Sequence, residues 1–352
     1  MEVHDLLAVA PERVVRTEHR RGLDEPVDPA ELRRNLRPYI VRHAHRRAAT
    51  NTPVERRRRE NATVTYPEDP GLVAVLQHLG VAADAVLGHG GEAWVYALDD
   101  DRIVRVLHAG GRAEHVRRRR ELVDELARGE SAFAFPKVIE INELDGRVFT
   151  FERRLRGRSV MDELRDCDGT QRNALIEAHL AAAAALGDLY LEPRGSFGDL
   201  IADEPIITTT WRAYLEQRIA TNLARSTPDL NAIDPVALAA ALPDTDAAAF
   251  VHLDAFAGNM LTDGEHITAV LDIGPTSVAG DRRLDPLATA LYLTSREITP
   301  TSRPGDVDVI MSWLRCAGLE EWFEPMRRWL AAYWSFALDD LAVTAWSRSV
   351  LL

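Results

Sequence analysis

Three polar residues near the middle of the chain have types and spacing that could support phosphoryl transfer. Asn259 follows Asp254 by five positions, and Asp272 comes 13 positions after Asn259. Short apolar runs that predict strands bracket these residues, at 250–253, 259–262 and 267–271. We therefore expect a loop at Asp254 and a hairpin that folds back and brings Asp272 to the same place.

Phosphoryl transfer needs cations on the phosphates and a base near the acceptor hydroxyl, with little covalent help from the protein. The Asp254 carboxylate could take the hydroxyl proton. Asn259 and Asp272 offer oxygen ligands that suit Mg²⁺, which binds few carboxylates and fills its shell with water and phosphate oxygens. Asp, Asn and Gly are also common in ordinary turns. Their order and spacing between short strands favour a catalytic loop over that alternative.

A glycine-rich segment lies between two expected strands nearer the N-terminus, with glycines at Gly88, Gly90 and Gly91. Glycine lets backbone amides approach phosphate oxygens closely. The segment is not a Walker-type loop, because no Gly-Lys-Ser/Thr follows and the next element is a strand. An ordinary hairpin turn would have the same composition. The position of these glycines directly before the strand at 103–107 favours nucleotide binding.

The stretch His-Leu-Asp-Ala-Phe-Ala-Gly-Asn at 252–259, followed by Leu-Asp-Ile-Gly at 271–274, resembles the aminoglycoside phosphotransferase and choline kinase-like family. Its members are relatives of protein kinases that phosphorylate small molecules, and the likeness runs from residue 66 to the C-terminus. The resemblance implies a two-lobed, protein-kinase-like α+β fold and an alcohol group as acceptor. The sequence departs from the family at Leu253, where glycine is usual, and at Ile273, where an aromatic residue is commoner.

The resemblance also assigns roles to residues. It implies that Asp254 is the catalytic base and that Asn259 and Asp272 hold Mg²⁺, with ATP or GTP as co-substrate. Asp285 and His252 are expected to brace the catalytic loop rather than take part in the reaction.

Arg105 occupies the position where kinases usually carry a lysine that contacts the α- and β-phosphates. Arginine keeps the positive charge, but its planar fork is larger than an ammonium group. Because Lys137 is the chain's single lysine, an arginine here is weak evidence of lost function. The expected partner is a carboxylate on the helix predicted at 113–127: Glu121 has the best spacing, with Glu114 and Glu125 as alternatives.

The segment 148–159 resembles the hinge between kinase lobes. Backbone groups from Glu152 to Arg154 would then bind the purine, and the choice between ATP and GTP stays open. We therefore expect an N-lobe over 66–152, with a small antiparallel sheet and one helix. A mainly helical C-lobe would follow over 153–352. Residues 1–64 carry 14 Arg against 10 Asp plus Glu, which predicts a basic, poorly ordered leader over 1–65.

The composition limits which binding partners and which cellular location we expect. The net charge of −13 argues against nonspecific nucleic-acid binding. The sequence has no apolar run long enough for a transmembrane helix and no secretory pattern at its start. Two isolated cysteines fit a reducing compartment. We expect a cytoplasmic monomer or homodimer that binds a nucleoside triphosphate and a small-molecule hydroxyl acceptor.

The acceptor cannot be read from the sequence. The leading hypothesis is an antibiotic or a related natural product, and acidic pairs at 320–321 and 339–340 would suit a polyamine if they line its site. Such pairs are more often simply surface residues. A metabolic kinase for a sugar or an amino alcohol is the alternative. A nucleotide-binding pseudokinase is a third hypothesis, motivated by Arg105 and Leu253.

Overall fold

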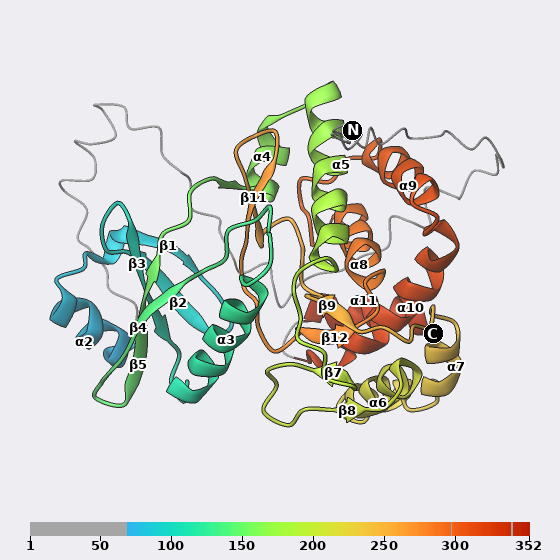
Figure 1. Ribbon diagram of the computed structural model, residues 1–352, viewed down its shortest axis with the longest axis horizontal. Coiled ribbons are helices and arrows are strands. Elements are labelled where there is room, and N and C mark those ends of the chain that lie inside the picture. The colour runs from blue at the N-terminus through green and yellow to red at the C-terminus, as the bar shows by residue number, and fades with distance from the viewer. Residues whose placement is uncertain (1–68, 297, 339–340) are drawn as a thin grey trace, which may run out of the picture.

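The computed structural model describes residues 69–296, 298–338 and 341–352, which form two lobes (Figure 1). One lobe is built on an antiparallel sheet and the other is mainly helical, so the predicted two-lobed α+β class is confirmed. The basic leader expected at 1–65 lies outside the described residues. Among the described residues, no helix is both long and apolar enough to cross a membrane.

The N-lobe sheet has five strands in the order β1-β2-β3-β5-β4, and every pairing is antiparallel. The strands are β1 (Val86–His89), β2 (Ala93–Ala97), β3 (Arg102–Leu107), β4 (Val138–Leu144) and β5 (Arg147–Arg153). Successive side chains of a strand point to opposite faces. In β3 this places the buried Val104 and Val106 on one face and Arg105 on the other.

Helix α2 (Pro70–Leu79) covers the face that carries Val104 and Val106. Its N-cap is Asp69, whose side chain accepts from the first turn and also from Arg147 of β5 at 2.7 Å. The helix ends at Gly80, which has a φ of 66° that favours glycine. The opposite face carries Arg105.

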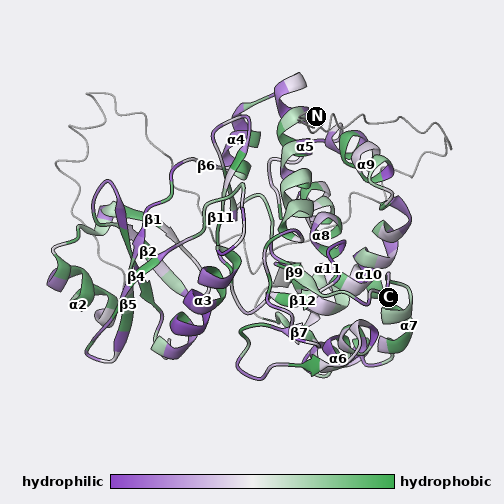
Figure 2. Ribbon diagram, viewed as in Figure 1, coloured by the Kyte–Doolittle hydropathy of each residue, from purple (hydrophilic) through white to green (hydrophobic). Residues whose placement is uncertain are grey.

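Helix α3 (Ala113–Leu126) lies between the sheet and the C-lobe (Figure 1). Figure 2 shows it mostly in hydrophilic colours, and its few apolar residues divide between the two lobes. Val116 packs against the sheet in one cluster. Leu122, Val123 and Leu126 belong to the core of the C-lobe. The helix is therefore part of both lobes by packing.

Polar contacts also join both ends of α3 to the C-lobe. Near its start, Arg112 and Arg118 pair with Asp203 at 2.7 and 3.0 Å. Near its end, the Glu125 carboxylate accepts from the backbone N–H of Glu192 at 2.7 Å and from Arg194 at 2.6 Å.

The linker after α3 continues this connection. Ala134 forms a bridge with Ala269 in β11 (Ile267–Val270). Its N–H donates to the carbonyl of Thr268 at 2.9 Å, and its own carbonyl accepts from Val270 at 3.0 Å. Because β11 leads directly to Asp272, the linker fixes the strand that carries this residue.

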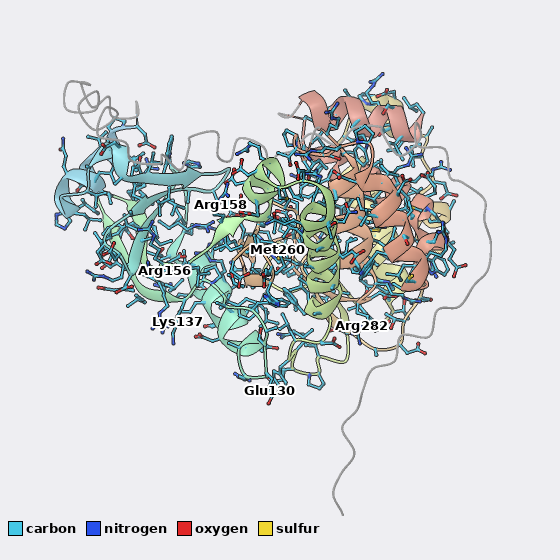
Figure 3. The ribbon with its side chains drawn as sticks, turned by 90° about the horizontal axis from the view of Figure 1, so that it is seen from above. Glu130, Lys137, Arg156, Arg158, Met260 and Arg282 are labelled. Carbon is cyan, nitrogen blue, oxygen red and sulfur yellow. The ribbon has the colours of Figure 1, made fainter. Side chains whose placement is uncertain are left out.

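The C-lobe contains two small sheets. One is four-stranded, in the order β8 (Ile207–Thr208), β7 (Phe197–Asp199), β12 (Val278–Gly280) and β9 (Ala249–Val251). The other has the order β11, β10 (Met260–Thr262) and β6 (Arg158–Ser159). Met260 is fully buried, and Figure 3 places it near the middle of the molecule, where the two lobes meet.

Helices make up the rest of this lobe. They are α4 (Val160–Asp166), α5 (Gly169–Leu186), α6 (Trp211–Leu223), α7 (Pro235–Ala240), α8 (Leu284–Thr294), α9 (Asp306–Cys316), α10 (Phe323–Tyr333) and α11 (Leu341–Leu351). Every residue of α8 is buried. A helix buried on all sides is a rigid support for whatever its ends hold.

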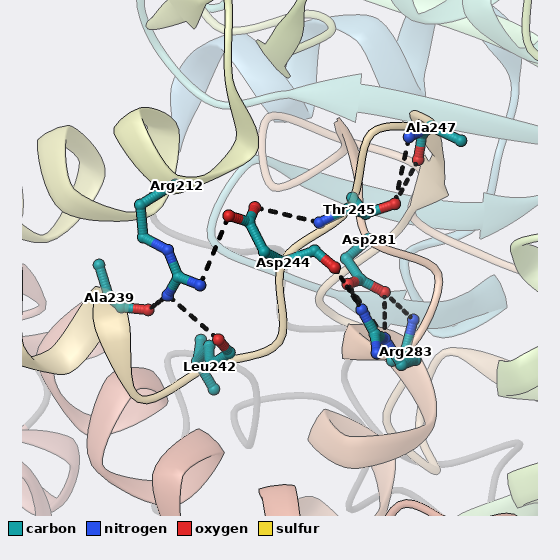
Figure 4. Close-up of polar contacts among 8 residues, drawn as sticks. All are labelled: Arg212, Ala239, Leu242, Asp244, Thr245, Ala247, Asp281 and Arg283. Carbon is teal, nitrogen blue, oxygen red and sulfur yellow. Dashed lines mark hydrogen bonds and ion pairs between the residues drawn. The ribbon is translucent and has the colours of Figure 1, made fainter.

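The loop that leads into β9 is fixed by two arginines (Figure 4). Arg212 of α6 donates to the carbonyls of Ala239 and, at 3.1 Å, Leu242. Arg283 donates to the carbonyl of Asp244 at 2.7 Å. These bonds therefore fix where the chain enters β9, the strand before the candidate catalytic loop.

A buried ion pair ties α5 to the start of α9. Arg172 donates to both carboxylate oxygens of Asp306, from Nε at 2.7 Å and from Nη2 at 2.5 Å, and to the carbonyl of Thr301 at 2.7 Å. The two side chains are 4% and 6% exposed. Removing one partner leaves the other charge buried without compensation.

We predict that Arg172→Met destabilises the protein by about 3–5 kcal/mol, measured by urea unfolding with tryptophan fluorescence. Arg172→Met combined with Asp306→Leu should lose less, because no charge stays unpaired. Arg117→Gln breaks an exposed pair with Glu114 and should change stability by less than about 1 kcal/mol. An Arg172→Met variant as stable as Arg117→Gln would contradict this account.

Candidate active site

The loop between β9 and β10 brings Asp254 and Asn259 into contact. Nδ2 of Asn259 donates to Oδ2 of Asp254 at 3.2 Å and to its carbonyl at 3.0 Å. Both residues are buried, at 9% and 7% exposed. Oδ1 of Asp254 is buried and has no hydrogen-bond partner among the described residues. The arrangement thus leaves one carboxylate oxygen for a group that the protein does not supply.

Asp272 reaches the same place from the end of the hairpin. The N–H of Leu271 donates to the carbonyl of Asn259 at 2.8 Å, so the hairpin folds back on the loop as expected. Asp272 has a φ of 54°, and its Oδ1 accepts from Nη2 of Arg105 at 3.2 Å. This contact joins the N-lobe sheet to the loop of the C-lobe.

Burial and a second carboxylate both act on the Asp254 carboxyl group. Burial raises the pKa of Asp254 well above its ordinary value, and the negative charge of Asp272 raises it further. The hydrogen bond from Asn259 acts in the opposite direction. Two nearby carboxylates repel each other, and a cation between them would relieve that repulsion.

The donor atoms fit magnesium. Because Nδ2 of Asn259 donates to Asp254, its Oδ1 is the amide atom left to bind an ion. The Asp272 carboxylate offers a second oxygen, and its side chain is 36% exposed. Mg²⁺ binds through one or two such protein oxygens together with phosphates and water.

The candidate catalytic loop is held by Asp285 in the first turn of α8. Its carboxylate accepts from the N–H of His252 and from the N–H of Leu253, each at 2.8 Å. The carbonyl of Leu253 accepts from the Tyr292 hydroxyl at 2.7 Å. Leu253 is fully buried and has a φ of 59°. It therefore adopts a left-handed backbone, which favours glycine, at a cost of about 1–2 kcal/mol.

His252 braces the loop as well. Its Nδ1 accepts from the N–H of Asp254 at 3.2 Å, which leaves Nε2 to donate to the carbonyl of Leu271 at 2.9 Å. Burial lowers its pKa, so the ring is neutral. Farther along the loop, His179 and Thr289 both contact the carbonyl of Ala255 at 3.0 Å. Both histidines therefore support the loop through bonds to its backbone.

The glycine-rich turn joins β1 and β2. The N–H of Gly90 donates to the carbonyl of Ala93 at 2.8 Å, and its carbonyl contacts Nε2 of His108 at 2.6 Å. A side chain at Gly88 would meet open space. The amide of Gly90 is thus used inside the turn, and the phosphate contact expected of Gly88 and Gly91 stays a prediction.

Arg105 does not pair with the helix carboxylate that the sequence suggested. Its Nη2 lies 3.2 Å from Asp272 and 3.4 Å from Glu92, which precedes β2. Burial opposes its charge, but the carboxylates of Asp272, Glu152 and Glu92 outweigh this and raise the pKa of Arg105.

The three candidate carboxylates on α3 are turned elsewhere. Glu121 is exposed. Glu114 pairs with Arg117 of its own helix, and Glu125 bonds to the C-lobe. The proposed pairing of Arg105 with Glu121 is therefore wrong, because the face of α3 toward the sheet does not carry a glutamate.

That face carries Arg119 instead. Its Nη2 donates to Glu152 of β5 at 2.9 Å, and Glu152 also accepts from the Thr150 hydroxyl at 2.8 Å. The side chains of Arg119 and Glu152 are 12% and 2% exposed. Sequence reasoning missed Arg119 within a run of four arginines. Its spacing of three from Val116 and four from Val123 was the available signal for a buried position.

Two backbone groups of the expected hinge are engaged within the N-lobe. The N–H of Arg153 donates to the carbonyl of Lys137 at 3.0 Å, and the N–H of Arg154 donates to the carbonyl of Asp101 at 2.8 Å. The purine contact expected of the other backbone groups from Glu152 to Arg154 stays a prediction. The side chain of Glu152 forms the buried ion pair with Arg119.

An antiparallel sheet over a helical lobe, with an Asp-Asn-Asp set at their junction, defines the protein-kinase-like class of fold. The profile of the phosphotransferase enzyme family, APH, matches residues 84–305. The chain belongs to this family. The match includes both lobes and every candidate site residue from Gly88 to Asp285. Among curated proteins, no sequence matches the chain significantly.

Two solved structures have the same fold. The gentamicin complex of APH(2″)-IIa is 13% identical, with a TM-score of 0.53 over 82% of this chain and 97% of that chain. The GDP complex of aminoglycoside 2′-phosphotransferase-IIIa is 11% identical, with a TM-score of 0.53 over 80% of this chain and 97% of that one.

We predict that Asp285 makes stability fall as the pH rises. Burial raises its pKa to about 7 in the folded protein, against about 3.9 when unfolded. The folded state therefore binds the extra proton between about pH 4 and pH 7. Over that window the free energy of unfolding should fall by up to about 1.4 kcal/mol per pH unit.

Urea unfolding at several pH values measures this effect. The stability advantage of the wild type over Asp285→Asn should shrink as the pH rises. The advantage over Asp246→Asn, an exposed position, should stay constant. A pH-independent difference between wild type and Asp285→Asn would show that the carboxyl group is ionised throughout.

Proposed function

We propose that this protein is a small-molecule kinase that transfers the γ-phosphate of ATP or GTP to a hydroxyl of an antibiotic or related natural product. The observation that carries the proposal is the convergence of four residues at the junction of the lobes: Asp254, Asn259, Asp272 and Arg105. Family membership supports the reaction class. The acceptor class rests on the similarity to a gentamicin complex.

Each of the four residues has a separate role in the proposed reaction. The acceptor hydroxyl gives its proton to Oδ1 of Asp254, the buried oxygen that has no partner. Its oxygen forms the new bond to the γ-phosphorus, and the nucleoside diphosphate leaves. Arg105, fixed on the sheet, contacts the phosphates of the donor. Asn259 and Asp272 would hold Mg²⁺, which neutralises phosphate charge when bound.

The raised pKa of Asp254 suits this role. A carboxylate whose pKa is raised takes a proton more readily than an ordinary carboxylate.

Two free cysteines, Cys167 and Cys316, fit a reducing cytoplasm, where nucleoside triphosphates are available. We place the reaction there.

A γ-phosphate transfer assay with Mg²⁺ and ATP or GTP tests the function. The acceptor panel should contain aminoglycosides, macrolides, nucleoside and peptide antibiotics, choline and simple sugars. Transfer to choline or a sugar alone would replace the antibiotic proposal with a metabolic kinase. Mg²⁺-dependent nucleotide binding without any transfer would point to an acceptor outside the panel.

We predict that Asp254→Ala lowers kcat by about 10²–10⁴-fold, because the acceptor hydroxyl loses its base. Nucleotide affinity, measured by isothermal titration calorimetry, should change by less than about threefold, which is under about 0.7 kcal/mol. Asp246→Asn is the control and should leave both quantities unchanged. Wild-type turnover by Asp254→Ala would remove Asp254 from the reaction.

We predict that Asp272→Ala abolishes the gain in nucleotide affinity that Mg²⁺ provides, because the charged ligand of the ion is lost. Calorimetric titrations with Mg²⁺ and with EDTA measure this gain. For the wild type and Asp246→Asn, the affinity with Mg²⁺ should be higher. An equal gain in Asp272→Ala would place the metal elsewhere.

A further inference from the structure

Arg105 and Glu152 share one face of the N-lobe sheet. Arg105 of β3 lies directly opposite Thr150 of β5, and Glu152 is two positions farther along the same strand. Residues two apart on a strand point to the same face. The Thr150 hydroxyl donates to Glu152 at 2.8 Å, and the charge of Glu152 raises the pKa of Arg105. The carboxylate of Glu152 is therefore a neighbour of Arg105.

Glu152 needs a cation in this environment. The residue is 1% exposed, and a buried carboxylate without a counter-charge is costly. Two guanidinium groups lie nearby, Arg105 on β3 and Arg119 on α3. Arg119 takes the position, at 2.9 Å. Arg105 is thereby left to face Asp272 at 3.2 Å, beside the catalytic loop.

The charges are the reverse of the usual kinase arrangement, in which a lysine of the third strand pairs with a helix glutamate. Here the helix supplies the cation and strand β5 supplies the carboxylate. Glu114 pairs with Arg117, Glu121 is exposed and Glu125 is bound to the C-lobe, so no glutamate of α3 pairs with Arg105. Arg105 must be oriented by another route.

We propose that Arg119 is a positioning residue: by binding Glu152, it prevents that carboxylate from capturing Arg105 and keeps Arg105 directed at the phosphates of the nucleotide. The inference rests on the proposed function, because it assumes that Arg105 contacts the donor phosphates. Without Arg119, the guanidinium of Arg105 turns toward Glu152 and away from Asp272.

Nucleotide titrations of four variants test this inference. Arg119→Gln should weaken Mg·ATP or Mg·GTP binding by about 10–100-fold, the loss of one hydrogen-bonded charge contact. Glu152→Gln should bind within about threefold of wild type, because the competing charge is gone. Arg119→Gln combined with Glu152→Gln should also return to about threefold. This rescue separates positioning from general damage to the fold, since the double variant lacks the same ion pair.

Three results would overturn the inference. Arg119→Gln that binds the triphosphate like wild type would overturn the inference. A double variant as weak as Arg119→Gln would overturn it too, because Arg119 would then touch the phosphates or support the fold. If Arg119→Gln is insoluble, a tenfold loss in Glu152→Gln is enough to reject the inference.

Arg105→Met separates this inference from the proposed function. If Arg105→Met loses triphosphate affinity while Arg119→Gln keeps it, the function stands and the positioning role fails. If Arg105→Met binds the triphosphate as tightly as wild type, the assignment of the nucleotide site itself is wrong.

Discussion

Two hydrogen bonds to one buried carboxylate fix the geometry on which the candidate site depends. Asp285 accepts from the backbone N–H groups of His252 and Leu253, and it sits on α8, a helix with no exposed residue. This anchor holds Leu253 in a left-handed conformation that an L-residue adopts only under constraint. The turn directs Asp254 at Asn259. Bulky side chains at a glycine position are thus tolerated when the surrounding bonds determine the backbone.

The N-lobe reaches this site through a single face of its sheet. Helix α2 covers the apolar face, so the polar residues of β3 and β5 gather on the other. Arg105 links that face to Asp272, and the linker at Ala134 links the N-lobe to the strand before Asp272. Two independent connections therefore converge on one aspartate. The position of Asp272 relative to the sheet depends on both.

Features that depend on short stretches of sequence could be predicted from the sequence. The helices at α3, α5 and α8 and the Asp254–Asn259–Asp272 set could be predicted, because periodicity and spacing lie within short windows. Strands such as β6, β7 and β12 have two or three residues and exist only through pairing with distant segments. The partner of Glu152 depends on how α3 is rotated against the sheet, which no window of sequence contains. The left-handed backbone of Leu253 depends on Asp285, 32 positions away.

Helix α3 is attached to both lobes, and most of its buried apolar residues pack in the C-lobe. Three of its apolar side chains are embedded there, while its polar link to the sheet is the bond between Arg119 and Glu152. The exposed pairs at Asp203 are screened by salt, and the buried bond is not. Higher ionic strength therefore weakens the ion pairs between the start of α3 and Asp203, and it leaves the buried bond between Arg119 and Glu152 in place.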